Sequence, residues 1–205
     1  PLAGLVLASP ANPTGTMLDR GELTAIAAWC SAHGVRLVSD EIYHGVTYGE
    51  GPDAKGVCAR EVDEHAIVVS SFSKYWGMTG WRLGWLLVPQ DLRAAVDALP
   101  GNIALCPPAA AQEAAVAAFS EESYRQCEAA LVDFGRAREL LLERVPELGW
   151  GAAAPADGAF YYWADLGDQL AGFADAREYA SALLEATGVA VTPGGDFDPC
   201  LLYTS

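Results

Sequence analysis

Residues 70–84 of the chain read SSFSKYWGMTGWRLG, and they contain one lysine, Lys74, and one arginine, Arg82. An apolar run, 66–69, precedes this stretch, so the stretch begins where a buried strand is predicted to end. Lys74 stands among aromatic residues, which predicts a buried ammonium group. Such a group is costly to bury and tends to lose its proton. A neutral lysine is a nucleophile suited to forming a Schiff base.

Four short apolar runs predict the strands of one sheet, over 4–8, 35–39, 66–70 and 83–88. Between the first two, Asp19 and Glu22 form a capping-box pattern that opens a helix, and Gly34 favours its end. This alternation of strand and helix predicts an α/β domain with a largely parallel sheet. Polar residues follow the first three strands, at the edge where open α/β sheets bind ligands.

The fourth strand is predicted to run antiparallel to the third. Fewer than ten residues connect Lys74 to the start of that strand. A parallel crossover usually needs a dozen or more residues, so the short connection favours a reversal of direction.

The remainder of the chain predicts helices and a second, smaller domain. We expect helices over 90–99, 107–119 and 120–145, with Pro100-Gly101-Asn102 ending the first of them. A small α+β unit follows, with strands over 159–163 and 189–191 and a helix over 175–186. The predicted domains are therefore 1–120 and 121–205.

The composition describes an acidic, apolar-rich chain of 205 residues, 52% of them apolar, with a net charge of −15. That charge argues against nucleic acid or an anionic membrane as a partner. No apolar run reaches the roughly 18 residues of a membrane span. Five scattered cysteines favour free, buried thiols in a reducing cytoplasm. The three histidines show no metal-ligand spacing, so we expect no metal.

Four motifs carry a resemblance to a known family: Asn12-Pro13-Thr14-Gly15, Asp40-Glu41-Ile42-Tyr43, Ser71-Phe72-Ser73-Lys74 and Gly80-Trp81-Arg82-Leu83-Gly84. In order and spacing they resemble the signatures of class I/II aminotransferases, pyridoxal 5'-phosphate enzymes with the fold of aspartate aminotransferase. The resemblance covers roughly 1–197. It implies the second half of a large cofactor-binding domain and most of a small domain. It also implies a mostly parallel sheet with one antiparallel strand and helices on both faces.

The resemblance assigns the central chemistry to Lys74 and Asp40. Lys74 would form a Schiff base with the cofactor and then move a proton between substrate and cofactor. Asp40 would face the pyridine nitrogen and keep it protonated, so that the ring acts as an electron sink. Taken alone, Asp40 is more simply a strand-end carboxylate that caps the next turn.

Further cofactor contacts are implied at both ends of the ring. Tyr43 and Asn12 would hydrogen-bond its phenolic oxygen, while Arg82 and Ser71 would bind its phosphate. Taken singly, Tyr43 fits a half-buried core residue and Asn12 a turn former. Arg82 stands between two apolar residues, which calls for a buried anionic partner. Glu41 receives no catalytic role.

Three functions fit these residues. The leading one is an aminotransferase, expected as a homodimer, that exchanges an amino group between an amino acid and a 2-oxo acid. A second is a C–S lyase or related eliminating enzyme with the same lysine. A third is the aminotransferase-like sensor domain of a transcriptional regulator. The residues do not specify the substrate.

Several features of the family are missing from the chain. Family members bind the substrate carboxylate with an arginine beyond segment 192–197, yet no arginine follows Arg177. Their phosphate loop and ring-stacking aromatic residue lie upstream of Pro1, and the tail 198–205 departs from the pattern. The chain also opens without methionine, almost directly in a predicted strand. We therefore expect a fragment that is inactive by itself.

Overall fold

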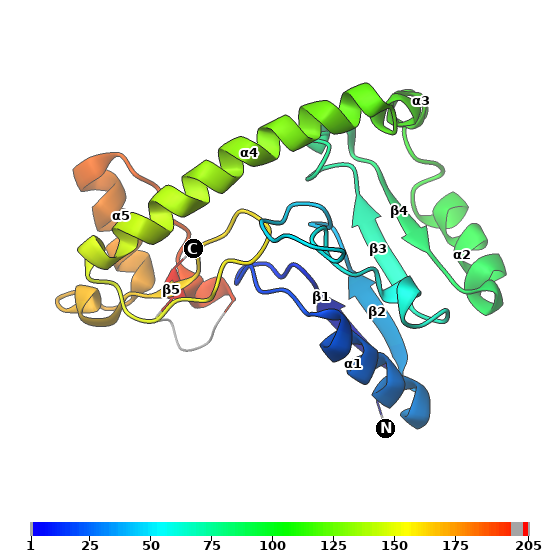
Figure 1. Cartoon of the computed structure of the whole chain (residues 1–205), viewed down its shortest axis with the longest axis horizontal. Helices are drawn as coiled ribbons and strands as arrows, with labels where there is room; N and C mark the ends of the chain where they lie inside the picture. Colours follow the sequence, from blue (N-terminus) through cyan, green and yellow to red (C-terminus); the bar gives the residue numbers. More distant parts are fainter. Residues whose placement is uncertain (1, 198–202, 205) are drawn as a thin grey trace.

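The computed structural model describes residues 2–197 and 203–204, and its first half is organised around a four-stranded sheet (Figure 1). The strands are β1 (Gly4–Ala8), β2 (Arg36–Asp40), β3 (Ile67–Ser71) and β4 (Gly84–Leu87), side by side in that order. β1, β2 and β3 are parallel, and β4 is antiparallel to β3. The predicted α/β class and the reversal of the fourth strand are confirmed.

Helix α1 (Arg20–His33) forms where the capping-box pattern predicts it. The Asp19 side chain accepts a 2.8 Å hydrogen bond from the Glu22 amide, and the Glu22 carboxylate accepts one of 3.0 Å from the Asp19 amide. These bonds satisfy amides that have no partner within the helix. Gly34 ends the helix in the left-handed conformation, with a φ of 64°.

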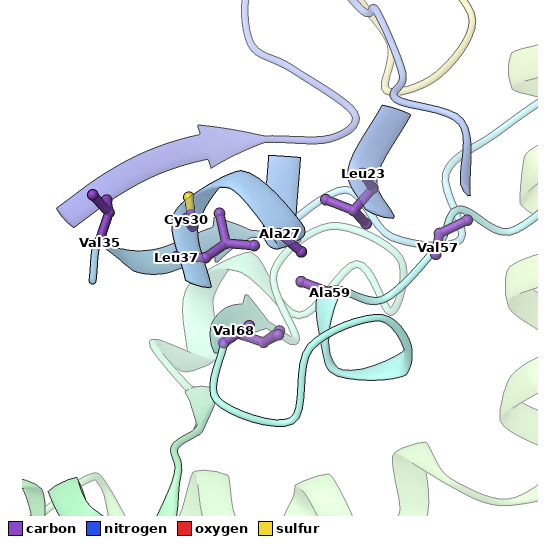
Figure 2. Packing of buried hydrophobic residues seen from close by; sticks show 9 residues of the cluster. Leu23, Ala27, Cys30, Val35, Leu37, Val57, Ala59 and Val68 are labelled. Atoms are coloured by element: carbon purple, nitrogen blue, oxygen red, sulfur yellow. The ribbon is translucent and has the colours of Figure 1, made fainter. Parts of the chain in front are cut away.

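The main core lies between α1 and the sheet (Figure 2). Leu23, Ala27 and Cys30 repeat at helical spacing on one side of α1, and they pack with Leu37 of β2 and Val68 of β3. Burial of this apolar surface fixes α1 against one face of the sheet. The strand ends beyond this core are thereby held in register.

The second half is mainly helical, with α2 (Gln90–Ile103), α3 (Ala109–Ala118), α4 (Glu121–Arg144) and α5 (Ala176–Thr187). Two short strands, β5 (Ala164–Asp165) and β6 (Tyr203–Thr204), pair antiparallel. Short 3₁₀ turns occupy Ala59–Glu61, Thr79–Trp81, Val145–Leu148, Gly167–Leu170 and Gly194–Asp196. In Figure 1, α4 runs from the end of α3 to the neighbourhood of α5. The division into domains 1–120 and 121–205 stays a prediction.

The predicted end of α2 at Pro100 is wrong, because the helix continues to Ile103. Proline removes its own amide donor and crowds the preceding turn, but it leaves its carbonyl free to accept a hydrogen bond. The Ala104 amide still bonds to the Pro100 carbonyl at 2.9 Å, and the Asn102 side chain donates to Ala98 O at 2.7 Å. These bonds close the last turn.

The two strands predicted at 159–163 and 189–191 are absent from the described part of the chain. Ala159 has a φ of 58°, and its amide bonds to Val46 O rather than to a neighbouring strand. The chain therefore turns at the point where a strand was expected. Residues 189–191 follow Gly188, which has a left-handed backbone. They form no strand pairing with any described residue.

Candidate active site

The topology brings the four motifs to one edge of the sheet. Ala8 at the end of β1 pairs with Asp40 at the end of β2, and β3 ends beside them at Ser71. Gly84 pairs with Ser71 at the start of the antiparallel β4, so Arg82 precedes that strand at the same edge. Ligand sites of open α/β sheets lie beyond this edge.

Packing against α3 holds the segment that carries Lys74. Phe72 is buried and lies against Ala115 and Ala118. The Trp76 indole nitrogen donates a 2.8 Å hydrogen bond to Ala118 O. Lys74 lies between these two anchors in sequence, so its backbone is fixed from both sides.

The ammonium of Lys74 lies among aromatic rings and is half-buried. Its Nζ atom is 5.3 Å from the centre of the Tyr43 ring and 5.4 Å from that of Phe160. Among the described residues, Nζ makes no hydrogen bond or ion pair. The amine is thus available to a ligand at the strand edge.

Tyr43 is the most enclosed of the predicted site residues, with 3% of its surface exposed. Its hydroxyl hydrogen-bonds the hydroxyl of Tyr161, and the two rings meet edge to face with centres 5.4 Å apart. Burial raises the pKa of the Tyr43 phenol. Either hydroxyl can be the donor in the hydrogen bond between Tyr43 and Tyr161.

Phe160 and Tyr161 are site residues that the sequence did not reveal. They belong to a run of aromatic residues whose pattern predicted a strand, and they come from a distant part of the chain. The density of aromatic residues in 160–163 was the one available signal.

Asp40 and Asn12 show the local contacts expected of strand ends and turns. The Asp40 carboxylate accepts a 3.1 Å hydrogen bond from the Ile42 amide and is half-buried. Asn12 is exposed in a turn closed by a 2.8 Å bond from the Gly15 amide to Ala11 O. The Asn12 side chain makes no hydrogen bond within 2–197 and 203–204.

Ser71 and its neighbours form a hydroxyl-rich end of the site. The Ser71 hydroxyl lies 2.9 Å from that of Ser73 and 3.1 Å from Leu83 O. Leu83 follows Arg82 directly, so these hydroxyl groups lie close to the chain segment that carries the guanidinium. A guanidinium and two hydroxyls are a donor set suited to an anion.

Arg82 makes no ion pair with any described side chain, and its expected anionic partner, the cofactor phosphate, stays a prediction. Arg82 is exposed, and its Nη1 atom donates to Thr79 O at 2.8 Å. Trp81 is 46% exposed. The 3₁₀ turn and the left-handed backbone of Arg82, with a φ of 53°, carry the segment to the surface.

Other predicted features can be examined in the part of the chain that the structure describes. There, no group of three or more His, Cys, Asp or Glu side chains could hold a metal ion. No helix among these residues has the length and apolar character needed to cross a membrane. Four cysteines are free, but only Cys30 is buried, and Cys106 is exposed. Cys200 lies outside the described residues.

Comparison with curated proteins finds aminotransferases. The chain is 51% identical over 198 residues to a valine–pyruvate aminotransferase of Mycobacterium tuberculosis, covering 97% of the chain and 50% of the relative. It is 32% identical to an aspartate aminotransferase of Geobacillus stearothermophilus, again over half of that relative. The chain spans about half the length of these relatives.

Comparison with solved structures agrees. An aminotransferase from Mycobacterium tuberculosis superposes with a TM-score of 0.93 at 49% identity, covering 100% of this chain and 52% of that one. A mutant aspartate aminotransferase of Thermus thermophilus gives 0.86 at 36% identity, covering 98% and 53%. The family model for aminotransferase class I and II matches residues 2–199. The chain therefore belongs to the aminotransferase class I and II family.

Proposed function

We propose that the whole protein is a pyridoxal 5'-phosphate-dependent aminotransferase that exchanges an amino group between an amino acid and a 2-oxo acid. The observation that carries the proposal is the half-buried Lys74, whose amine lies beside the rings of Tyr43 and Phe160 at the ligand-binding edge of the sheet. The 51% identity to a valine–pyruvate aminotransferase supports it.

The donor set fits the cofactor at both ends. Arg82 makes no ion pair among the described residues, and its segment adjoins the hydroxyls of Ser71 and Ser73, which suits a phosphate. Asp40 lies at the end of the neighbouring strand and suits a protonated ring nitrogen. Bound there, the cofactor would supply an electron sink for the bonds of the substrate α-carbon.

In this proposal the side chains divide the work of binding and proton transfer. Asp40 holds the proton on the ring nitrogen, and Tyr43 and Asn12 donate hydrogen bonds to the phenolic oxygen. Arg82 and Ser71 bind the phosphate. Lys74 would hold the cofactor covalently through Nζ, and its amine would also move a proton from the substrate α-carbon to the C4′ atom of the cofactor.

We further infer an aliphatic amino donor, with pyruvate as acceptor, because the relative with 51% identity is named for valine and pyruvate. A homodimer in the cytoplasm follows from the family resemblance and from the expected free thiols. The acidic composition supports small-molecule partners rather than nucleic acid.

A donor screen tests the function. The whole protein, loaded with cofactor, is mixed with single amino acids and either pyruvate or 2-oxoglutarate, and the new amino acid is quantified. We expect transfer from valine to pyruvate, and none with Lys74→Ala. Lys55→Ala is the matched control, because Lys55 and Lys74 are the two lysines of the chain.

Two results would point to the other functions. Release of ammonia and pyruvate from a cysteine conjugate, without transfer to an oxo acid, would identify an eliminating enzyme. Cofactor binding without turnover of any amino acid, together with sequence-specific DNA binding by the whole protein, would identify a regulator.

A further inference from the structure

The segment 156–161 is fixed to the loops that follow β1 and β2. The Gly158 amide donates to Gly15 O at 2.9 Å, and the Ala159 amide donates to Val46 O at 2.7 Å. The Tyr48 hydroxyl donates to Ala159 O at 2.5 Å. Three hydrogen bonds thus tie a distant part of the chain to the strand edge where Lys74 lies.

Close packing fixes the same segment sterically. A Cβ atom added to Gly158 would lie 2.6 Å from Pro10 Cγ and 2.9 Å from Met17 Sδ. Only glycine allows this approach of the two segments. Phe160 and Tyr161 follow directly, and their rings therefore reach the site from a fixed backbone.

The two phenols, of Tyr43 and Tyr161, are placed to exchange a hydrogen bond. Their rings meet at an interplanar angle of 77°, and Tyr43 is almost fully enclosed. Each hydroxyl has one proton and can also accept a bond. The Tyr43 proton can therefore go to Tyr161 or to a ligand, but not fully to both.

We propose that Tyr161 is a positioning residue, which donates its proton to the Tyr43 oxygen and so directs the Tyr43 proton toward the phenolic oxygen of the ligand. This inference rests on the proposed function. A phenol that accepts a hydrogen bond becomes a stronger donor, because successive hydrogen bonds polarise one another. Tyr161 would thus tune the cofactor through Tyr43 without touching it.

Loss of the Tyr161 hydroxyl should change the visible absorbance of the bound cofactor. The hydrogen bond from Tyr43 stabilises the unprotonated linkage between Lys74 and the cofactor. Weakening it raises the pH at which the visible absorbance of the bound cofactor changes. Tyr161→Phe keeps the ring and loses the hydroxyl, so we expect this midpoint to rise by about 0.4–1 pH unit. The dissociation constant of the cofactor should rise about 2- to 10-fold.

The adjacent Tyr162 supplies a matched control. It is also half-buried, and its hydroxyl makes no hydrogen bond among the described residues. Tyr162→Phe should leave both the midpoint and the dissociation constant unchanged. Melting curves of both variants report whether the fold is intact.

A double-mutant cycle decides whether Tyr161 acts through Tyr43. In the whole protein carrying Tyr43→Phe, adding Tyr161→Phe should shift the midpoint no further. Three results would overturn the inference. They are an equal shift in both backgrounds, no shift in Tyr161→Phe alone, or the same shift in Tyr162→Phe. If the parent protein shows no visible band with cofactor, the proposed function itself fails and this inference falls with it. A band without the predicted shift refutes the positioning role alone.

Discussion

The Glu128 carboxylate on α4 accepts a 2.5 Å hydrogen bond from the hydroxyl of Tyr75, the residue after Lys74. The same carboxylate oxygen accepts a 2.5 Å bond from Lys55. Helix α4 is thereby joined to the segment that carries Lys74 and to the loop that carries Lys55. This junction is the first target for mutation.

Removing the junction should loosen α4 from the lysine segment. Glu128 is 48% exposed, so water screens the interaction, and Glu128→Ala should cost about 0.5–1 kcal/mol. For a protein of this size that lowers the melting temperature by about 1–4 °C. Glu139→Ala, on the same helix, is the control, since Glu139 is exposed and makes no hydrogen bond or ion pair with any described residue. Equal losses in both variants would contradict a specific role for Glu128.

Gly84 should tolerate no side chain. A Cβ atom there would lie 2.6 Å from Ser70 O, inside the β3–β4 pair that brings Arg82 to the site. Gly84→Ala should destabilise the fold by about 1–3 kcal/mol in urea unfolding and weaken cofactor binding. At Gly80 a Cβ atom meets nothing within 4 Å, so Gly80→Ala is the matched control. An unchanged unfolding midpoint for Gly84→Ala would refute this packing.

Glu41 should contribute to stability rather than to chemistry. It is 3% exposed, and its carboxylate accepts a 2.7 Å hydrogen bond from the Ala59 amide. Glu41→Ala leaves that buried donor without a partner and should cost about 1–3 kcal/mol in chemical denaturation. Glu41→Gln keeps an acceptor and should recover most of this loss. Glu64→Ala, at an exposed glutamate, should be neutral, and a similar loss there would contradict the assignment.

Stability should fall in alkali partly through Cys58. Burial is the main cause that raises the pKa of this thiol to about 11 from its ordinary value of 9.0, and the nearby Glu41 carboxylate raises it further. Because the folded state binds the thiol proton more tightly, this thiol adds to the free energy of unfolding. The added stability is complete below pH 9 and is lost as the pH rises through 11. Cys58→Ala should flatten the fall in melting temperature between these values, whereas exposed Cys106→Ala should not. Identical slopes for Cys58→Ala and the parent would contradict the assignment.

The sequence predicted those parts of the fold that depend on contacts between residues close together in the chain. The capping pair of Asp19 and Glu22 and the left-handed Gly34 set both ends of α1 within the helix itself. The direction of β4 followed from the short connection after Lys74. In each case the deciding contacts lie within about fifteen residues.

The parts that sequence misjudged depend on distant contacts. The aromatic run from Phe160 has a strand's composition, but the backbone of Ala159 is held by Val46 and Tyr48 from another loop. The partnership of Tyr43 with Tyr161 joins residues 118 positions apart, beyond any local pattern.

The central claim is that Lys74 binds the cofactor covalently, and reduction with borohydride tests it most directly. The whole protein is loaded with pyridoxal 5'-phosphate, reduced and digested, and the peptides are mapped by mass spectrometry. Lys55 and Lys74 are the two lysines of this chain. Within the chain, the added cofactor mass can therefore appear on one of two peptides. We expect the cofactor mass on Lys74, retained in Lys55→Arg and lost in Lys74→Arg. Labelling of Lys55, or of a lysine outside this chain, with Lys74 unmodified would contradict it.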